Sequence, residues 1–202
     1  MSRYRSAMLI LGAFVSAVLS APATAAVSAP PAAVPVAAVA VPESFETGFG
    51  GWVPDTDGLA PAWSIKRSTD QAHDGAYSLR FFTDGRQDDG TTWAERKFAV
   101  TPGTTVRVTV TFWLWSEHRA DFNNWKVVAS AGVRDPEIER DFVQIGLTDQ
   151  VAGWSPYRMT STVTADASGT IWVAVGTSVL WESVRQYFVD FVGVEILSVG
   201  VS

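Results

Sequence analysis

The feature that most constrains the fold of this chain is a strict alternation, V-R-V-T-V-T-F-W-L-W, between Val106 and Trp115. Successive side chains of a β-strand point to opposite faces, so this segment predicts one strand with two different faces. One face suits a sandwich core and carries Val106, Val108, Val110, Phe112 and Leu114. The other carries Arg107, Thr109, Thr111, Trp113 and Trp115, where a solvated face usually has Lys, Glu and Ser. We therefore expect the second face to contact a ligand or a partner.

Short β-rich runs separated by turn signals extend through the rest of the chain beyond Pro42. The turns include Asp74-Gly75, Asp84-Gly85, Asp89-Gly90 and Pro102-Gly103. Strands at this spacing, with no segment of helical period, indicate an all-β sandwich. The expected strands are 77–83, 93–100, 105–115, 125–133, 142–147, 157–164, 170–176 and 187–197.

The first 42 residues predict an export signal followed by a spacer. Arg3 and Arg5 precede an apolar run and the small-residue sequence Ala23-Thr24-Ala25, which is the layout of a secretory signal peptide over residues 1–25. Residues 26–42 are almost entirely Ala, Val and Pro, which favours an extended linker rather than a folded element. Residues 43–202 then form one domain, and we expect the product to be secreted.

Composition and motifs exclude several classes of function. The chain has 15 Lys and Arg against 21 Asp and Glu, so nucleic acid is not an expected partner. The apolar run near the N-terminus is too short to span a membrane, and cysteine is absent. No nucleophile elbow or phosphate loop is present, and Glu137 and Glu139 lie in a charged run typical of a solvated loop. We expect no enzymatic activity.

Five segments together resemble a known family. They are S-F-E-T-G-F-G-G-W from Ser44, H-D-G-A-Y-S-L from His73, F-A-V-T-P-G-T-T-V-R-V-T-V from Phe98, G-W-S-P-Y from Gly153 and Y-F-V-D-F-V-G-V from Tyr187. In this order they resemble the galactose-binding-like jelly rolls of secreted carbohydrate-binding modules, whereas 113–151 matches no such module. The resemblance implies a β-sandwich with jelly-roll topology and a carbohydrate partner.

The same resemblance implies a structural calcium ion where the first and last strands meet. Its ligands would be Glu46 of F-E-T-G, the H-D-G loop around Asp74, and Asp190 of the closing strand. Carboxylates and backbone carbonyls are the oxygens that calcium prefers. Many relatives have a second Asp where this chain has Phe191. The alternative for Asp190 is a buried carboxylate held by backbone donors.

The expected ligand-binding residues are tryptophans on strand faces that the core does not use, together with one in the loop between the last two strands. Trp113 and Trp115 are the central pair, with Trp93 and Trp181 as flanking rings and Arg107 as a polar partner. Indole rings stack on the apolar face of a sugar ring and tolerate partial exposure. The alternative is a structural or adhesion module whose Trp face packs on another protein or on its own copy. Residues 121–124 or 134–141 could also cover that face.

Overall fold

The computed structural model describes residues 37–199, with side chains from residue 42 onward. The strands of this part of the chain are β1 (Ala37–Glu43), β2 (Val53–Thr56), β3 (Trp63–Ser68), β4 (Ser78–Asp84), β5 (Thr91–Ala99), β6 (Thr105–Ser116), β7 (Lys126–Gly132), β8 (Val143–Leu147), β9 (Gly153–Thr164), β10 (Thr170–Ser178) and β11 (Val184–Ser198). A single 3-10 turn, Glu139–Asp141, lies between β7 and β8.

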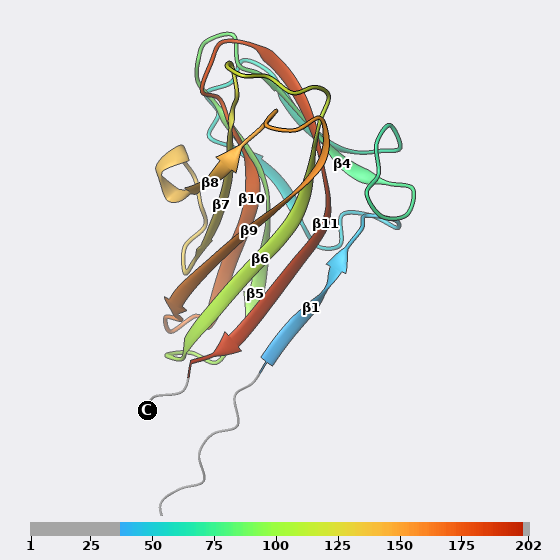
Figure 1. Ribbon diagram of the computed structural model, residues 1–202. Coiled ribbons are helices and arrows are strands. Elements are labelled where there is room, and N and C mark those ends of the chain that lie inside the picture. The colour runs from blue at the N-terminus through green and yellow to red at the C-terminus, as the bar shows by residue number, and fades with distance from the viewer. Residues whose placement is uncertain (1–36, 200–202) are drawn as a thin grey trace, which may run out of the picture. The chain divides into compact units, whose positions relative to one another are not determined.

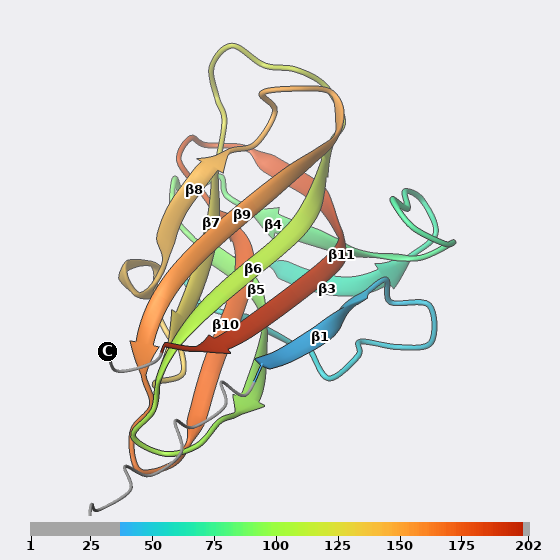
Figure 2. The same ribbon diagram turned by 60° about the horizontal axis from the view of Figure 1, so that its bottom comes forward.

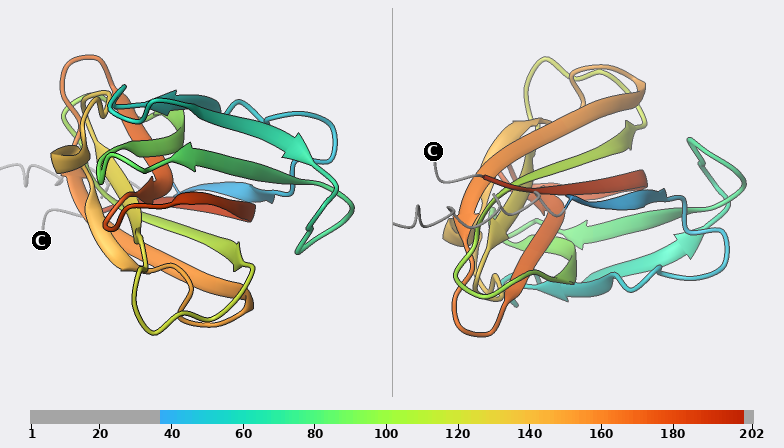
Figure 3. Two further views of the ribbon diagram at one scale, coloured as in Figure 1. Left: turned by 90° about the horizontal axis from the view of Figure 1, so that it is seen from above. Right: turned by 90° about the horizontal axis from the view of Figure 1, so that it is seen from below.

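The strands form two antiparallel sheets packed face to face, as Figure 1 and the end-on views of Figure 3 show. The first sheet has the order β3-β4-β11-β6-β9, with β1 also paired to β11. The second has the order β2-β5-β10-β7-β8. This arrangement confirms the expected all-β sandwich.

The core lies between the two sheets and is filled by alternate side chains of each strand. On β6 the expected inward residues, from Val106 to Leu114, are all at most 2% exposed. On β10, Ile171 and Val173 are fully buried and face them. The alternation in the sequence therefore predicted both the strand and its buried face.

The boundary between linker and domain differs from the prediction. Residues 37–42, expected to belong to the linker, form β1, which pairs antiparallel with β11 from Ala37↔Leu197 to Glu43↔Val192. Alternating Ala and Val suit an edge strand, and Pro42 is tolerated near its end because an edge strand has one unpaired side. The predicted signal peptide and residues 26–36 lie outside the described residues. The short strands β2 and β3 were not expected either.

A bulge in β11 allows two strands to share its outer edge. β4 pairs with Val184–Val189 and β1 pairs with the half from Val192 onward, as Figure 2 shows for β1. The register against β6 shifts between Asp190 and Gly193, and Phe191 adopts φ of 53°. This break turns Asp190 toward the loop before β4, where its carboxylate meets backbone N–H groups.

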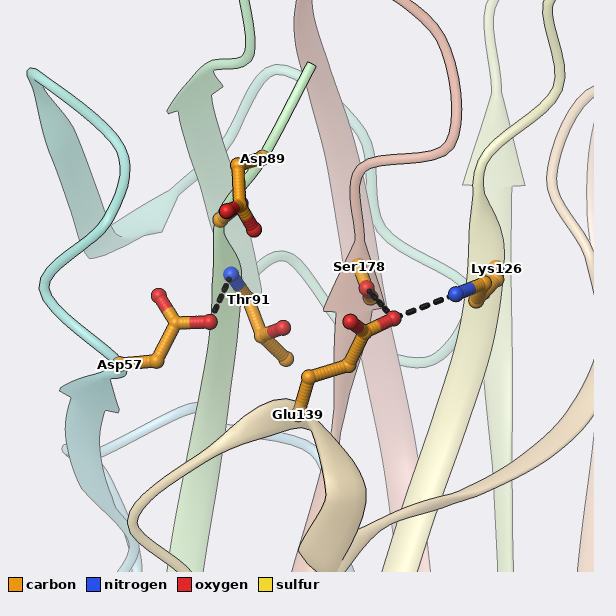
Figure 4. Close-up of polar contacts among 7 residues, drawn as sticks. Asp57, Asp89, Thr91, Lys126, Glu139 and Ser178 are labelled. Atoms are coloured by element: carbon orange, nitrogen blue, oxygen red, sulfur yellow. Dashed lines mark hydrogen bonds and ion pairs between the residues drawn. The ribbon is translucent and has the colours of Figure 1, made fainter. Parts of the chain in front are cut away.

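A segment that we call the strap, residues 133–142, crosses the outer face of the second sheet. Its 3-10 turn is the short coil beside β8 in Figure 1. Glu139 accepts hydrogen bonds from Ser178 of β10 (2.8 Å) and from Lys126 of β7, as Figure 4 shows. Phe142 packs against the ring of Trp93, with 5.0 Å between ring centroids. The strap therefore covers the sheet face that Trp93 shares.

Candidate functional site at the loop end of the sandwich

Trp113 and Trp115 lie on the outer face of the first sheet, as predicted, but both are only partly exposed. The imidazole of His73 stacks on Trp113, with 4.0 Å between centroids and 18° between planes. Trp115 meets the ring of Phe188 edge-on, with 5.4 Å between centroids. One face of Trp113 is thus occupied by the protein's own side chain, which reduces the area free for a ligand.

The structure contradicts the expectation that Trp93 is a flanking surface ring. Its side chain is 0% exposed, and its indole N–H donates to Glu95 Oε2 over 2.8 Å. Trp93 is buried because the strap covers it, and no sequence pattern indicates that the strap lies on this face. Segment 134–141 was weighed as a cover for Trp113 and instead lies over the other sheet, as its contact with Trp93 requires.

Arg107 and Trp181 do not share a site with Trp113. Arg107 is exposed and lies six residues from Trp113 on the same strand, about 20 Å away at the usual rise per residue. Trp181 lies in the loop between β10 and β11 with 55% of its surface exposed. The five residues predicted to bind ligand are therefore distributed over three parts of the molecule.

Two exposed aromatic rings come together at one end of the sandwich, in what we call the loop rim. Trp181 is 55% exposed and Phe122 is 81% exposed, and they are the only aromatic residues among the exposed large hydrophobic side chains of 42–199. They line a shallow hollow of about 430 Å³ together with Asp88, Asn123 and Glu182. Exposed rings beside carboxylates and an amide give both an apolar surface and hydrogen-bonding groups.

The backbone beneath the loop rim is held by buried contacts. The indole N–H of the fully buried Trp125 donates to Trp181 O over 2.9 Å. The Gly85 N–H donates to Ser183 O over 2.9 Å, and a Cβ at Gly85 would lie 2.7 Å from the Trp125 ring. The loops at the top of Figure 1 thus present the two rings from an ordered base.

Phe122 was not among the predicted ligand-binding residues, whose aromatic members were all tryptophans. The available signal was a single aromatic residue inside the polar run R-A-D-F-N-N between two predicted strands. A large ring in such a loop has no core to enter, and here it reaches solvent. Asn123 beside it adopts φ of 63°, as does Asp88 across the hollow at 59°.

The three predicted calcium ligands lie around one loop, and their carboxylates accept hydrogen bonds from protein donors. Asp190, which is 0% exposed, accepts from the N–H groups of His73 and Asp74 at Oδ2 (2.8 and 2.9 Å) and of Phe191 at Oδ1. Glu46 Oε1 accepts from the N–H groups of residues 76 and 77. A Cβ at Gly75 would lie 2.5 Å from the Glu46 carboxyl carbon, so only glycine fits there.

This geometry does not fit a calcium ion shared by Glu46, Asp74 and Asp190. The loop turns its N–H groups toward the carboxylates, whereas calcium requires oxygen atoms pointing inward. Asp74 is exposed and accepts from the Ser44 hydroxyl over 2.7 Å. Within residues 42–199 no group of three or more His, Asp or Glu side chains is placed to hold a metal ion. The carboxylates of the buried Asp190 and the exposed Glu46 fasten the loop through hydrogen bonds.

Chelation tests the calcium expectation directly. We expect excess EDTA to leave the melting temperature of the protein unchanged, because backbone N–H groups already satisfy the carboxylates of Glu46 and Asp190. Differential scanning calorimetry with and without the chelator provides the measurement. A fall in melting temperature that added calcium reverses would establish a metal site at this corner.

Comparisons with known proteins identify the fold of the chain. No protein-family model matches the sequence, and neither does any curated protein. Among solved structures, the CBM22-1 xylan-binding domain of Xyn10C from Paenibacillus barcinonensis matches with a TM-score of 0.50 at 15% identity, over 84% of this chain and 100% of that one. A carbohydrate-binding module of the β-sandwich superfamily, described as promiscuous in specificity, also matches at 0.50 and 15%, over 74% of this chain and 59% of that one.

The fold is that of jelly-roll carbohydrate-binding modules. This confirms the fold that the quoted sequence segments led us to expect.

A larger hollow lies away from the loop rim, between the strap and the end of β9. It measures about 970 Å³ and is lined by residues 130–138, 140–141 and 161–164, which include no aromatic residue. This hollow therefore lacks the aromatic stacking surface that the rim provides. As to membranes, no helix within the described range has the length and apolar character of a membrane span.

Proposed function

We propose that the protein is a secreted, non-catalytic module that binds a glycan at the loop rim. The observation that carries this proposal is the convergence of two exposed rings, Trp181 and Phe122, on one hollow of a carbohydrate-binding-module fold. Secretion rests on the signal-peptide pattern of residues 1–25.

The chemistry of the loop rim suits a sugar. A pyranose presents axial C–H groups that pack on an indole face, and its hydroxyls require donors and acceptors at the ring's edge. Asn123, Asp88 and Glu182 supply these groups around the hollow. Because the site is shallow and wet, we expect dissociation constants on the order of micromolar to millimolar.

The strand face around Trp113 and Trp115, predicted from the sequence, is a second possible glycan site with less support. Trp113 is partly exposed and also borders a second hollow of about 370 Å³ with Phe191 and Pro156. The imidazole of His73 stacks on one face of the Trp113 ring. The loop rim is favoured because both of its rings are exposed by more than half.

Alanine substitution separates the two sites. We expect Trp181→Ala and Phe122→Ala each to weaken glycan binding at least about tenfold, since each removes a stacking surface worth roughly 1 kcal/mol or more. The measurement is a glycan-array screen followed by titration calorimetry on the hit. Trp172→Ala is the matched control, because that partly exposed indole lies under Lys97 on the other sheet (4.1 Å to the ring centroid). Loss of binding in Trp113→Ala alone would move the site to the strand face.

A second candidate function uses the same surface for protein contact. Leu180 and Val184 are exposed beside Trp181, so the rim includes an apolar area of more than two side chains. A structural or adhesion module would bury that area on another protein or on its own copy. Sedimentation that depends on concentration, is abolished by Trp181→Ala and is insensitive to sugars would favour this alternative.

A further inference from the structure

A polar pocket adjoins the loop rim on the side of the first sheet. It has a volume of about 260 Å³ and lies between the loops after β6 and β8 and the start of β11. Its polar lining consists of Glu117, His118, Asp149, Arg185, Gln186 and Tyr187. Residues from three separate segments thus supply hydrogen-bonding groups to one small hollow.

Asp149 is the buried anchor of this pocket. Its side chain is 1% exposed, and its Oδ2 accepts from the Tyr187 hydroxyl (2.7 Å) and the Thr148 hydroxyl (2.9 Å). Its Oδ1 accepts no hydrogen bond from any side chain or backbone group of the described residues. Its backbone adopts φ of 57° and its N–H donates to Ser116 Oγ over 3.0 Å. Because Asp149 lines the pocket, this oxygen can accept a hydrogen bond from a ligand there.

Arg185 lines the pocket and links it to the loop rim. Its Nη1 lies 3.4 Å from His118 Nε2 in the pocket, and its Nη2 donates to the backbone oxygen of Asn123 in the rim over 3.3 Å. Its Nε donates to Ser183 Oγ over 3.2 Å. The guanidinium is therefore held on three sides, and it contacts one residue of each hollow.

We propose that the polar pocket is a second sugar subsite, next to the one at the loop rim, and that the pair selects uncharged glycans. This inference rests on the proposed function. A sugar whose neighbour stacks on Trp181 would place a hydroxyl against Asp149 Oδ1, while His118 and Gln186 offer groups at the pocket's open side. A sugar hydroxyl that donates to a carboxylate forms a charge-assisted hydrogen bond, which is stronger than a hydrogen bond between neutral groups.

The carboxylates around the two hollows would select neutral sugars over acidic ones. Asp88 and Glu182 line the rim, and Glu117 and Asp149 line the pocket. Arg185 is the opposing cation of the pocket, and each of its three nitrogens already has a protein partner, in Ser183, His118 or Asn123. A uronate or sialate carboxylate would meet repulsion here without a free cation to bind, whereas a neutral ring would not.

The experiment compares affinity with ligand length. Titration calorimetry would use the full chain with neutral xylo-, cello- and galacto-oligosaccharides of one to four units, and galacturonate oligomers of the same lengths. We expect the second neutral unit to strengthen binding about tenfold in the unmodified protein. That gain should disappear in Asp149→Asn, with monosaccharide affinity within about twofold of the original. Gln144→Ala, an exposed amide on β8, is the control.

The outcomes of this experiment distinguish the second subsite from the loop-rim site. If Asp149→Asn does not fold, the exposed His118→Ala and Gln186→Ala variants test the same loss of length dependence. Binding whose length dependence survives all three variants, or binding that prefers galacturonates, would overturn the second subsite and leave the rim proposal standing. An unmodified protein that binds none of these sugars would overturn both.

Discussion

Replacing Asp190 by alanine is expected to lower the free energy of unfolding by about 3–5 kcal/mol, because it leaves buried N–H groups without an acceptor. The Asp190 carboxylate accepts from the N–H groups of His73, Asp74 and Phe191 and is fully buried. Burial raises the pKa of Asp190, and these three donors act against that rise. The loop before β4 and the bulge of β11 therefore depend on one side chain.

Chemical denaturation of the purified protein measures this loss. Asp74→Ala is the control, because Asp74 is exposed and accepts only from Ser44 Oγ, so its removal should cost less than about 1 kcal/mol. Asp190→Asn keeps a carbonyl acceptor and should fall between the two. An Asp190→Ala variant as stable as the Asp74→Ala variant would contradict the role given to this carboxylate.

The stability of the protein is expected to fall as the pH rises from about 4.5 to about 7, because of a carboxyl pair between Glu95 of β5 and Asp135 of the strap. Burial, with the nearby Asp135 and Asp55, raises the pKa of Glu95 from 4.5 to about 7, although the Trp93 indole N–H lowers it. Burial also raises the pKa of Asp135, against the effects of Glu95 and Lys97. Asp135 Oδ1 is buried without a donor.

The sign of this effect follows from proton binding. Between pH 4.5 and 7 the folded protein holds more protons at Glu95 than the unfolded chain, so this contribution is fully present below 4.5 and is lost as pH passes 7. A pKa rise of this size corresponds to about 3 kcal/mol. Glu95→Gln should therefore remove that decline and be the more stable protein at pH 8.

Urea unfolding of both proteins between pH 4 and 8 provides the comparison. Glu137→Gln, an exposed change on the same strap, should retain the decline seen in the unmodified protein. Glu139 opposes the effect, because its hydrogen bonds from Lys126 and Ser178 lower its pKa in spite of burial. Identical pH profiles for Glu95→Gln and the unmodified protein would refute the assignment.

Much of the fold could be predicted from the sequence because it depends on local alternation. The period of two in β6 determines which side chains are buried, and Ile171 and Val173 repeat the pattern in β10. The strand β1 was not predicted because the prolines of residues 26–42 indicated a linker, although only Pro42 lies in the strand and the rest of it alternates Ala and Val. β1 pairs with β11, which lies more than 140 residues later, and no local sequence pattern indicates that pairing.

The candidate site was predicted less well, since it depends on contacts between distant segments. Trp93 has the parity of a surface residue, and only the return of the chain at Phe142 buries it. Trp181 was identified as a loop aromatic, but its neighbour Phe122 comes from a loop about 60 residues away in sequence. Residue type indicates what a side chain can bind, whereas the meeting of two loops requires the folded chain.

The strap determines how a polysaccharide can approach the second sheet. Because Glu139 and Phe142 hold it against the outer face, a long polymer cannot lie along the part of that face beneath the strap. A glycan at the loop rim would meet the molecule end-on and engage only a few sugar units. Firm attachment to a polymer surface would then require several copies acting together, with the strength of attachment set by their number and spacing.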